Sequence, residues 1–202
     1  MKPCGLTLIL SAIMVENFPH LMNPPLAAPP ENWHENFIVH LASLIQPKVY
    51  VELGLYQCEL FNRIIPFAGR LIGVDIDPKA GTYMQKTNKT EFVHSRSDTY
   101  ADIAAKNGLK IDLLFIDADH SYESVLDDFT RYLPLMNEQA VILLHDGFPR
   151  NKKYTDPGYC GNGYRAIQEL TENQKGYEMM TIPIHPGLTL ARKRATHLPW
   201  SE

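Results

Sequence analysis

The chain has 202 residues, of which 45% are hydrophobic and 21% are charged, and its formal net charge is −4. This length fits one domain, or one domain with an appendage, and the composition is that of a soluble globular protein. The negative balance argues against a general nucleic-acid or membrane-surface binder, because such proteins need a basic surface. Three widely spaced cysteines (Cys4, Cys58 and Cys160) form no disulfide framework or zinc motif, so we expect a reducing, cytoplasmic location.

The N-terminal segment contains a short apolar run, GLTLILSAIMV (5–15). It is too short to span a membrane. One alternative is the core of a signal peptide with LAA (26–28) as a poor cleavage site; the other is a buried or partner-covered segment. A protein start at Met14 or Met22 would make the run an artefact.

A proline-rich stretch, NPPLAAPPENW (23–33), follows this run and is typical of an extended connector. We therefore divide the chain into an N-terminal extension with its connector (1–34) and a folded domain (35–202).

Beyond the connector, helical and strand patterns alternate regularly. Apolar residues at helical spacing predict helices at 36–46, 57–65, 124–136 and 163–172. Short apolar or β-branched runs predict strands at 49–53, 70–76, 91–95, 111–117 and 140–146, and a closing hairpin from 177–184 and 187–193. This order predicts an α/β fold: a Rossmann-like, doubly wound, mostly parallel sheet of seven strands with an antiparallel last strand and helices on both faces.

Polar side chains follow each of the parallel strands, where ligands bind in open α/β sheets. Gly54 comes directly after the first strand, and Asp75 follows 21 residues later, at the end of the second. That spacing suits a carboxylate that accepts hydrogen bonds from ribose hydroxyls. Ordinary turn chemistry at the glycine and a helix cap at the aspartate are the structural alternatives.

The first loop, GLYQCE (54–59), lacks the further glycines of a dinucleotide-binding fingerprint. A loop with Tyr56 and Cys58 leaves little room for a pyrophosphate at the start of the next helix. We therefore expect a nucleoside cofactor without phosphates.

The stretches VYVELGLYQCEL, LIGVDIDP, HSRSD, LLFIDADHSYESVLDDF and ILLHDGF resemble, in this order, class I S-adenosylmethionine-dependent methyltransferases. More narrowly, they resemble the group that includes macrolide-sugar O-methyltransferases and cephalosporin-hydroxylase-like proteins. The resemblance covers about residues 35–193, and DADHSYE and HD are its more specific parts.

The resemblance implies S-adenosyl-L-methionine as the cofactor and assigns a set of residues to it. Glu52 and Gly54, with Tyr56 in the same loop, line the methionine part. Asp75 holds the ribose, and Ile76 lies against the adenine. The remaining members are Ser97 and Asp98 at the adenine edge, and Asp117 facing the cofactor amino group or a metal.

His120 takes the place of the general base in the sugar methyltransferases, and an imidazole has a suitable pKa for that role. The structural alternative is that it caps the following helix together with Ser121. Asp146 matches a metal-ligand aspartate, so Asp117, Asp146 and His145 form a candidate divalent-metal site. Relatives carry an acid where this chain has His145, which weakens a Mg²⁺ site and favours a transition metal. Cys58 is a second departure, because a glycine is usual there.

The segment RNKKYTDPGYCGNGY (150–164) is expected to be a lid over the substrate, with Tyr154, Tyr159 and Tyr164 as candidate acceptor contacts. We predict an S-adenosylmethionine-dependent O-methyltransferase that acts on a sugar or another polyhydroxylated small molecule. Neither a nucleic-acid partner nor a membrane span is expected, and a homo-oligomer is left open. Two alternatives remain: a hydroxylase-like metal enzyme and a non-catalytic cofactor-binding protein on the same fold. His34 is interpreted as a surface or packing residue.

Overall fold

The structure is a computed structural model that describes residues 29, 30 and 32–194. The chain divides into two compact units, Met1–Trp33 and His34–Glu202. In the first unit, the backbone N–H of Trp33 donates to the carbonyl of Pro30 at 3.0 Å. The apolar run and most of the proline-rich connector lie outside the described residues.

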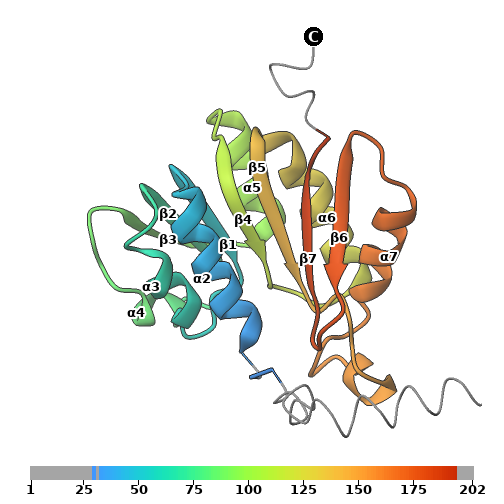
Figure 1. Ribbon diagram of the computed structural model, residues 1–202. Helices are drawn as coiled ribbons and strands as arrows, with labels where there is room; N and C mark the ends of the chain where they lie inside the picture. Colours follow the sequence, from blue (N-terminus) through green and yellow to red (C-terminus); the bar gives the residue numbers. More distant parts are fainter. Residues whose placement is uncertain (1–28, 31, 195–202) are drawn as a thin grey trace, which may run out of the picture. The chain divides into compact units, whose positions relative to one another are not determined.

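The second unit is built on one seven-stranded sheet in the order β3-β2-β1-β4-β5-β7-β6 (Figure 1). Neighbouring strands in the run β3-β2-β1-β4-β5 are parallel. Strand β7 pairs antiparallel with both β5 and β6. The predicted sheet with an antiparallel last strand is therefore confirmed. The strand bounds are β1 Val49–Leu53, β2 Arg70–Asp75, β3 Thr90–His94, β4 Ile111–Ile116, β5 Met136–His145, β6 Tyr177–Ile182 and β7 Leu188–Lys193.

Helices cover both faces of the sheet (Figure 1). On one face lie α5 (Ser97–Lys106), α6 (Tyr122–Tyr132) and α7 (Tyr164–Glu172), and their apolar side chains form one buried cluster with alternate residues of the strands. On the other lie α2 (Trp33–Ile45), α3 (Glu59–Ile64) and the short α4 (Ala80–Tyr83). Two 3₁₀ turns, η2 (Leu133–Leu135) and η3 (Lys152–Thr155), complete the elements.

The central strand β1 illustrates why both faces must be covered. Val51 and Leu53 point into the cluster beneath α5 and α6, whereas Tyr50 packs its ring 6.1 Å from that of Phe61 in α3. Side chains alternate along a strand, so a strand with apolar residues at every position needs a helical layer on each side.

Two differences from the predicted elements have clear physical reasons. Helix α6 ends at Tyr132 rather than at residue 136, because Pro134 cannot continue a helix and lies in the η2 turn; strand β5 then begins four residues earlier than predicted, at Met136. Helix α5 was not predicted. Its buried residues are Tyr100, Ala101 and Ala104, and two alanines give little hydrophobic periodicity.

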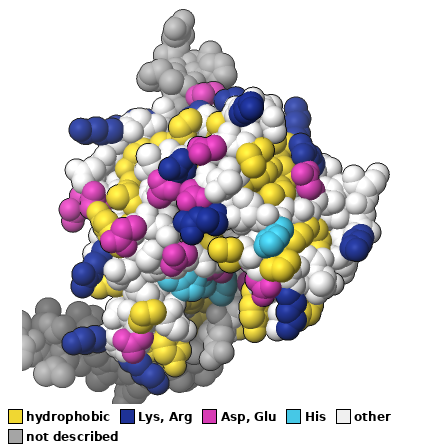
Figure 2. Space-filling view, turned by 180° about the vertical axis from the view of Figure 1, so that it is seen from behind, with side chains coloured by type: hydrophobic (Ala, Val, Ile, Leu, Met, Phe, Trp, Pro, Cys, Tyr) yellow, Lys and Arg dark blue, Asp and Glu magenta, His cyan; other side chains and the backbone are white. Residues whose placement is uncertain are grey.

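No helix in the described part of the chain is long and apolar enough to cross a membrane. On the face seen in Figure 2, basic and acidic side chains are interspersed rather than gathered into a patch of one sign. This face therefore offers no basic footprint for nucleic acid.

The turns that follow β1 and β4 are in close contact. Gly54 has φ +82°, and a Cβ at this position would lie 2.2 Å from the carbonyl oxygen of Asp117. The backbone N–H of Asp117 in turn donates to the carbonyl of Leu53 at 2.9 Å. Only a glycine satisfies both the backbone conformation and the spacing.

We predict that Gly54→Ala destabilises the protein by at least about 2 kcal/mol, because it adds a backbone clash to an unfavourable φ. Gly108→Ala is the matched control: Gly108 has φ +65° with open space around it, so this change should cost about 1 kcal/mol. Urea unfolding of both variants measures the difference. Equal costs would mean that the contact with Asp117 relaxes without penalty.

Candidate functional site

A cavity of about 1110 Å³ opens at the carboxyl ends of β1, β2, β4 and β5. Most of the residues predicted for the site line it: Glu52, Gly54, Tyr56, Asp75, Ile76, Ser97, Asp117, His120, His145, Asp146, Tyr154 and Tyr159. Two predicted residues do not. The carboxylate of Asp98 pairs with Arg96 at 2.9 Å, and the hydroxyl of Tyr164 accepts from Arg165 at 3.3 Å.

The loop after β1 is fixed by Asp75. One carboxylate oxygen of Asp75 accepts from the backbone N–H of Leu55 at 2.8 Å and of Tyr56 at 3.3 Å, and the other accepts from Asp77 at 2.8 Å. Every one of these donors belongs to the two turns that flank the cavity. Asp75 therefore organises the rim before any ligand arrives.

Cys58 has a backbone conformation that suits the glycine expected at its position. Its φ is +57°, in the left-handed region, which costs a residue with a Cβ about 1–2 kcal/mol. The side chain is fully buried, and its thiol donates to the carbonyl of Ala80 at 3.3 Å. The cysteine thus preserves the shape of the turn and connects it to α4.

Glu52 is a buried carboxyl at the base of the cavity. It is 3% exposed, and the hydroxyl of Tyr50 donates to its Oε2 at 2.5 Å. Burial raises the pKa of Glu52 to about 8, the hydrogen bond from Tyr50 opposes this rise, and the negative charge of Asp117 adds to it.

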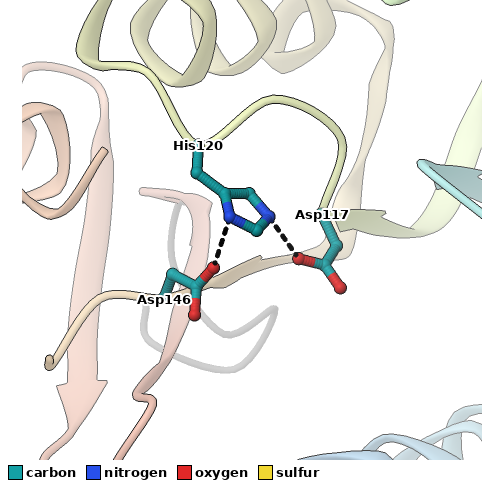
Figure 3. Close-up of side chains that lie close together, drawn as sticks. All are labelled: Asp117, His120 and Asp146. Atoms are coloured by element: carbon teal, nitrogen blue, oxygen red, sulfur yellow. Dashed lines mark ion pairs between the residues drawn. The ribbon is translucent and has the colours of Figure 1, made fainter. Parts of the chain in front are cut away.

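Two aspartates and two histidines meet at the ends of β4 and β5. The imidazole of His120 lies between two carboxylates, with Nε2 3.4 Å from Asp117 Oδ1 and Nδ1 3.2 Å from Asp146 Oδ2 (Figure 3). His145 Nδ1 lies 3.0 Å from Asp117 Oδ1 and 3.3 Å from Asp146 Oδ1. Asp117 Oδ1 and both ring nitrogens of His145 are buried without a hydrogen bond of good geometry.

This cluster can hold a cation. Asp117, His120 and Asp146 each offer a ligand atom, and these atoms lie within 4.8 Å of one another. The predicted third ligand, His145, is also close to both carboxylates, as the distances above show. Oxygen and imidazole donors together suit a divalent transition metal better than Mg²⁺.

Opposite charges within the cluster stabilise one another. The close contact with the Asp117 carboxylate raises the pKa of His120 to about 9, against the opposing effect of burial. Burial lowers the pKa of His145, but Asp117 and Asp146 outweigh it and raise that pKa to about 10. Burial raises the pKa of Asp117, yet the histidines hold it well below its usual value. At neutral pH the cluster without a metal is therefore two carboxylates and two imidazolium ions.

The predicted lid is docked on the loop after β4. The backbone N–H of Gly163 donates to the carbonyl of His120 at 2.8 Å, and a Cβ on Gly161 would lie 2.4 Å from the same oxygen. Asn162 Oδ1 accepts from the backbone N–H of Tyr122 at 2.7 Å. Gly161 and Gly163 allow this close approach, and the hydrogen bond from Gly163 holds the backbone of His120.

Aromatic rings from two loops form one wall of the cavity. The ring of Tyr154 lies 4.2 Å from that of His185 and 5.4 Å from that of Tyr159. The carbonyl of Tyr159 also lies 2.5 Å from His120 Nδ1. Tyr159 thus connects this aromatic wall to His120.

Sequence reasoning missed two residues of the cavity. His34, at the start of α2, lines it with its ring 4.3 Å from that of His145, and burial followed by the charge of His145 lowers the pKa of His34 to about 4. His185 lies between β6 and β7. The prediction drew on the ends of the parallel strands and on the 150–164 segment, and neither histidine lies in these parts of the chain.

Residues 51–147 match a family model described as a methyltransferase domain. No curated protein matches the sequence. The matched stretch runs from β1 to the end of β5 and contains the cavity floor and the histidine–aspartate cluster.

Several solved structures share the fold. An O-methyltransferase from Bacillus cereus in complex with SAH is 16% identical, with a TM-score of 0.67 over 96% of this chain and 92% of that one. The O-methyltransferase TomG from Streptomyces achromogenes, in complex with SAM, is 18% identical, with a TM-score of 0.64 over 90% and 88%. The SAH-bound methyltransferase PaMTH1 from Podospora anserina is 14% identical, with a TM-score of 0.66 over 96% and 98%. At these identities the likeness shows the fold alone.

The charge cluster predicts how stability depends on pH. A histidine whose pKa is raised on folding stabilises the protein fully below about pH 6.5, and this contribution is lost as the pH rises through about 9. With EDTA present, the free energy of unfolding should therefore fall from about pH 6 to about pH 10, and less steeply in His120→Asn. Urea unfolding at the two pH values measures both slopes, and His40→Asn, on the exposed side of α2, is the control. Identical slopes for His120→Asn and the wild type would contradict the prediction.

Proposed function

We propose, from the membership of residues 51–147 in the methyltransferase domain family, that this chain transfers the methyl group of S-adenosylmethionine to a hydroxyl of a small molecule. The predicted class I methyltransferase fold is confirmed by that match and by the solved structures. The observation that carries the proposal is the cavity at the strand ends, which gathers all of the predicted cofactor residues except Asp98. Its first loop has room for a nucleoside and lacks the glycines that a pyrophosphate needs.

The cavity offers a suitable group for each part of this cofactor. S-adenosylmethionine supplies a methyl group that is already activated by the sulfonium charge. Asp75 would accept the ribose hydroxyls, and Ile76, which is 65% exposed, would cover one face of the adenine. Glu52 and Asp117 would compensate the positive charge of the methionine part, and Ser97 would lie towards the adenine edge, whereas Asp98, also predicted there, pairs with Arg96 outside the cavity lining.

His120 is our candidate for the general base. A hydroxyl is a very weak acid and needs help to lose its proton as the methyl group is transferred. With a pKa of about 9, His120 already carries a proton in the empty site at neutral pH. His120 can accept a proton from the acceptor hydroxyl only after it has lost the proton that it already carries. Positive charge placed next to Asp117 would promote that loss. The proposed role therefore requires an occupied site.

A sugar or another polyhydroxylated molecule is the acceptor that we propose. Tyr154 and Tyr159 present aromatic rings at the open side of the cavity, where they could stack against a sugar face. Tyr164, also predicted for this role, contacts Arg165 instead and belongs to the start of α7.

A divalent metal on Asp117 and Asp146, with His145 or His120 as the third ligand, is compatible with these donors. Such an ion would lower the pKa of an acceptor hydroxyl. The two choices of histidine have different consequences, since a histidine that binds the metal cannot also act as a base.

The nitrogen and oxygen donors of the cluster also favour a second candidate, a hydroxylase-like metal enzyme on the same fold. Bound iron in the purified protein would support it. The third possibility, a cofactor-binding protein without turnover, is suggested by Cys58 in the place of a usual glycine. Cys58 adopts the left-handed backbone conformation that favours a glycine, which weakens that suggestion.

The cofactor proposal predicts calorimetric binding of both S-adenosylmethionine and S-adenosylhomocysteine. Asp75→Ala should weaken both by at least about tenfold, because it removes the ribose acceptor and the bonds that hold the first loop. Asp112→Ala, which removes a carboxylate that bonds to Val49 and Asn137 at the other end of the strands, is the control. No binding by the wild type would refute the proposal, and unchanged affinity in Asp75→Ala would refute the ribose assignment.

The metal and base roles can be separated with His120→Ala and His145→Ala. If His120 is the base, His120→Ala keeps cofactor affinity and Mn²⁺ affinity but loses most turnover, whereas His145→Ala weakens Mn²⁺ binding at least about tenfold. Calorimetric titration with Mn²⁺ and with Mg²⁺ measures the metal affinities. Loss of Mn²⁺ binding in His120→Ala, with normal binding in His145→Ala, would make His120 the metal ligand.

A further inference from the structure

Glu52 occupies an unusual position for a carboxyl group. It lies on the central strand β1, is 3% exposed, and still forms part of the cavity floor. Its described hydrogen-bond donor is the hydroxyl of Tyr50, which is itself fully buried. A neutral phenol donor is a weak substitute for water around a charged carboxylate.

The charged groups around Glu52 do not compensate a negative charge there. Asp117 lies across the floor at the end of β4, and Glu35 faces it from α2; both act to keep the proton on Glu52. The nearby cations are engaged elsewhere, because Arg63 pairs with Glu35 at 2.9 Å and His145 lies 3.0 Å from Asp117. Other titratable groups on the surrounding elements include Cys58 and Glu59 at the start of α3, Asp75 at the end of β2, Lys79 at the start of α4 and His34 at the start of α2.

Two carboxyls on the same floor therefore differ in protonation. Asp117 is ionised beside histidines, whereas Glu52, beside a tyrosine and other acids, keeps its proton at neutral pH. Environments that push the pKa values of two carboxyl groups apart give these groups different proton-transfer roles.

We infer that Glu52 is a carboxylic acid in the empty protein and becomes a carboxylate when the cofactor binds, so that each binding event releases one proton from Glu52 to solvent. The inference rests on the proposed function, since it takes the α-ammonium group, which S-adenosylmethionine and S-adenosylhomocysteine share, as the positive charge that replaces the proton.

The exchange keeps the buried charge in balance. An α-ammonium near Glu52 favours the ionised carboxylate by direct attraction, and the tyrosine hydroxyl remains as its donor. Binding and ionisation are then linked, so cofactor affinity rises with pH as long as the empty protein must lose the proton. Below about pH 8 this rise approaches tenfold for each pH unit.

The test is calorimetric titration with S-adenosylhomocysteine in phosphate and in Tris, whose heats of ionisation differ, so that the apparent enthalpies give the number of protons released. At pH 7 the wild type should release about 0.9 proton more than Glu52→Gln, and the affinity of Glu52→Gln should vary much less with pH. Tyr50→Phe keeps the carboxyl but removes the donor that favours ionisation, so the pH at which affinity levels off should move upward. Tyr177→Phe is the matched control, because Tyr177 is a buried tyrosine outside the cavity lining whose hydroxyl donates to the carbonyl of Leu170 at 2.9 Å.

Each outcome has a distinct meaning. Binding with equal proton release in the wild type and Glu52→Gln would overturn the inference and leave the methyltransferase proposal intact. Failure of the wild type to bind at any pH would overturn the proposed function instead. Infrared titration of the protein without cofactor checks independently that Glu52 carries a proton. The wild type should show a carboxylic-acid carbonyl band that disappears on titration through about pH 8, and Glu52→Gln should lack this band. Absence of this band would also refute the inference.

Discussion

The contact between the turns after β1 and β4 is the constraint on which the rest of the site depends. Gly54 lies so close to the carbonyl of Asp117 that no side chain fits between them. This contact places Glu52 and Asp117 on one floor, since each lies within two residues of it along its own strand. The repulsion between the two carboxyls follows from that spacing, and it adds to the burial that keeps Glu52 protonated.

The histidine–aspartate cluster links the chemistry of the site to its architecture. Its members come from the ends of β4 and β5, and the lid is held against the same loop by Gly161, Asn162 and Gly163. A glycine-rich lid is usually interpreted as mobile. Here the glycines allow backbone atoms to approach His120, so the lid and the histidine are ordered together.

A consistent electrostatic picture follows for a cationic cofactor. The empty cavity keeps a proton on Glu52 and two protonated histidines beside Asp117 and Asp146, so its buried acids are already compensated. A ligand or metal that brings positive charge must replace these protons. Binding of such a ligand and the protonation of Glu52 and the two histidines are therefore linked, and pH will affect both.

The sequence alone determined the strand–helix order, the parallel sheet with its antiparallel last strand and the polar residues at the strand ends. Hydrophobic periodicity and the residue types at strand ends are local properties of a sequence, which is why they could be predicted. The sequence did not reveal α5, whose buried alanines carry little signal, or the early end of α6 at Pro134. Only the tertiary structure decided that His34 and His185 join the cavity, that Tyr164 does not, and that His120 lies between two carboxylates. Those facts depend on contacts between segments far apart in the chain, which no local pattern contains.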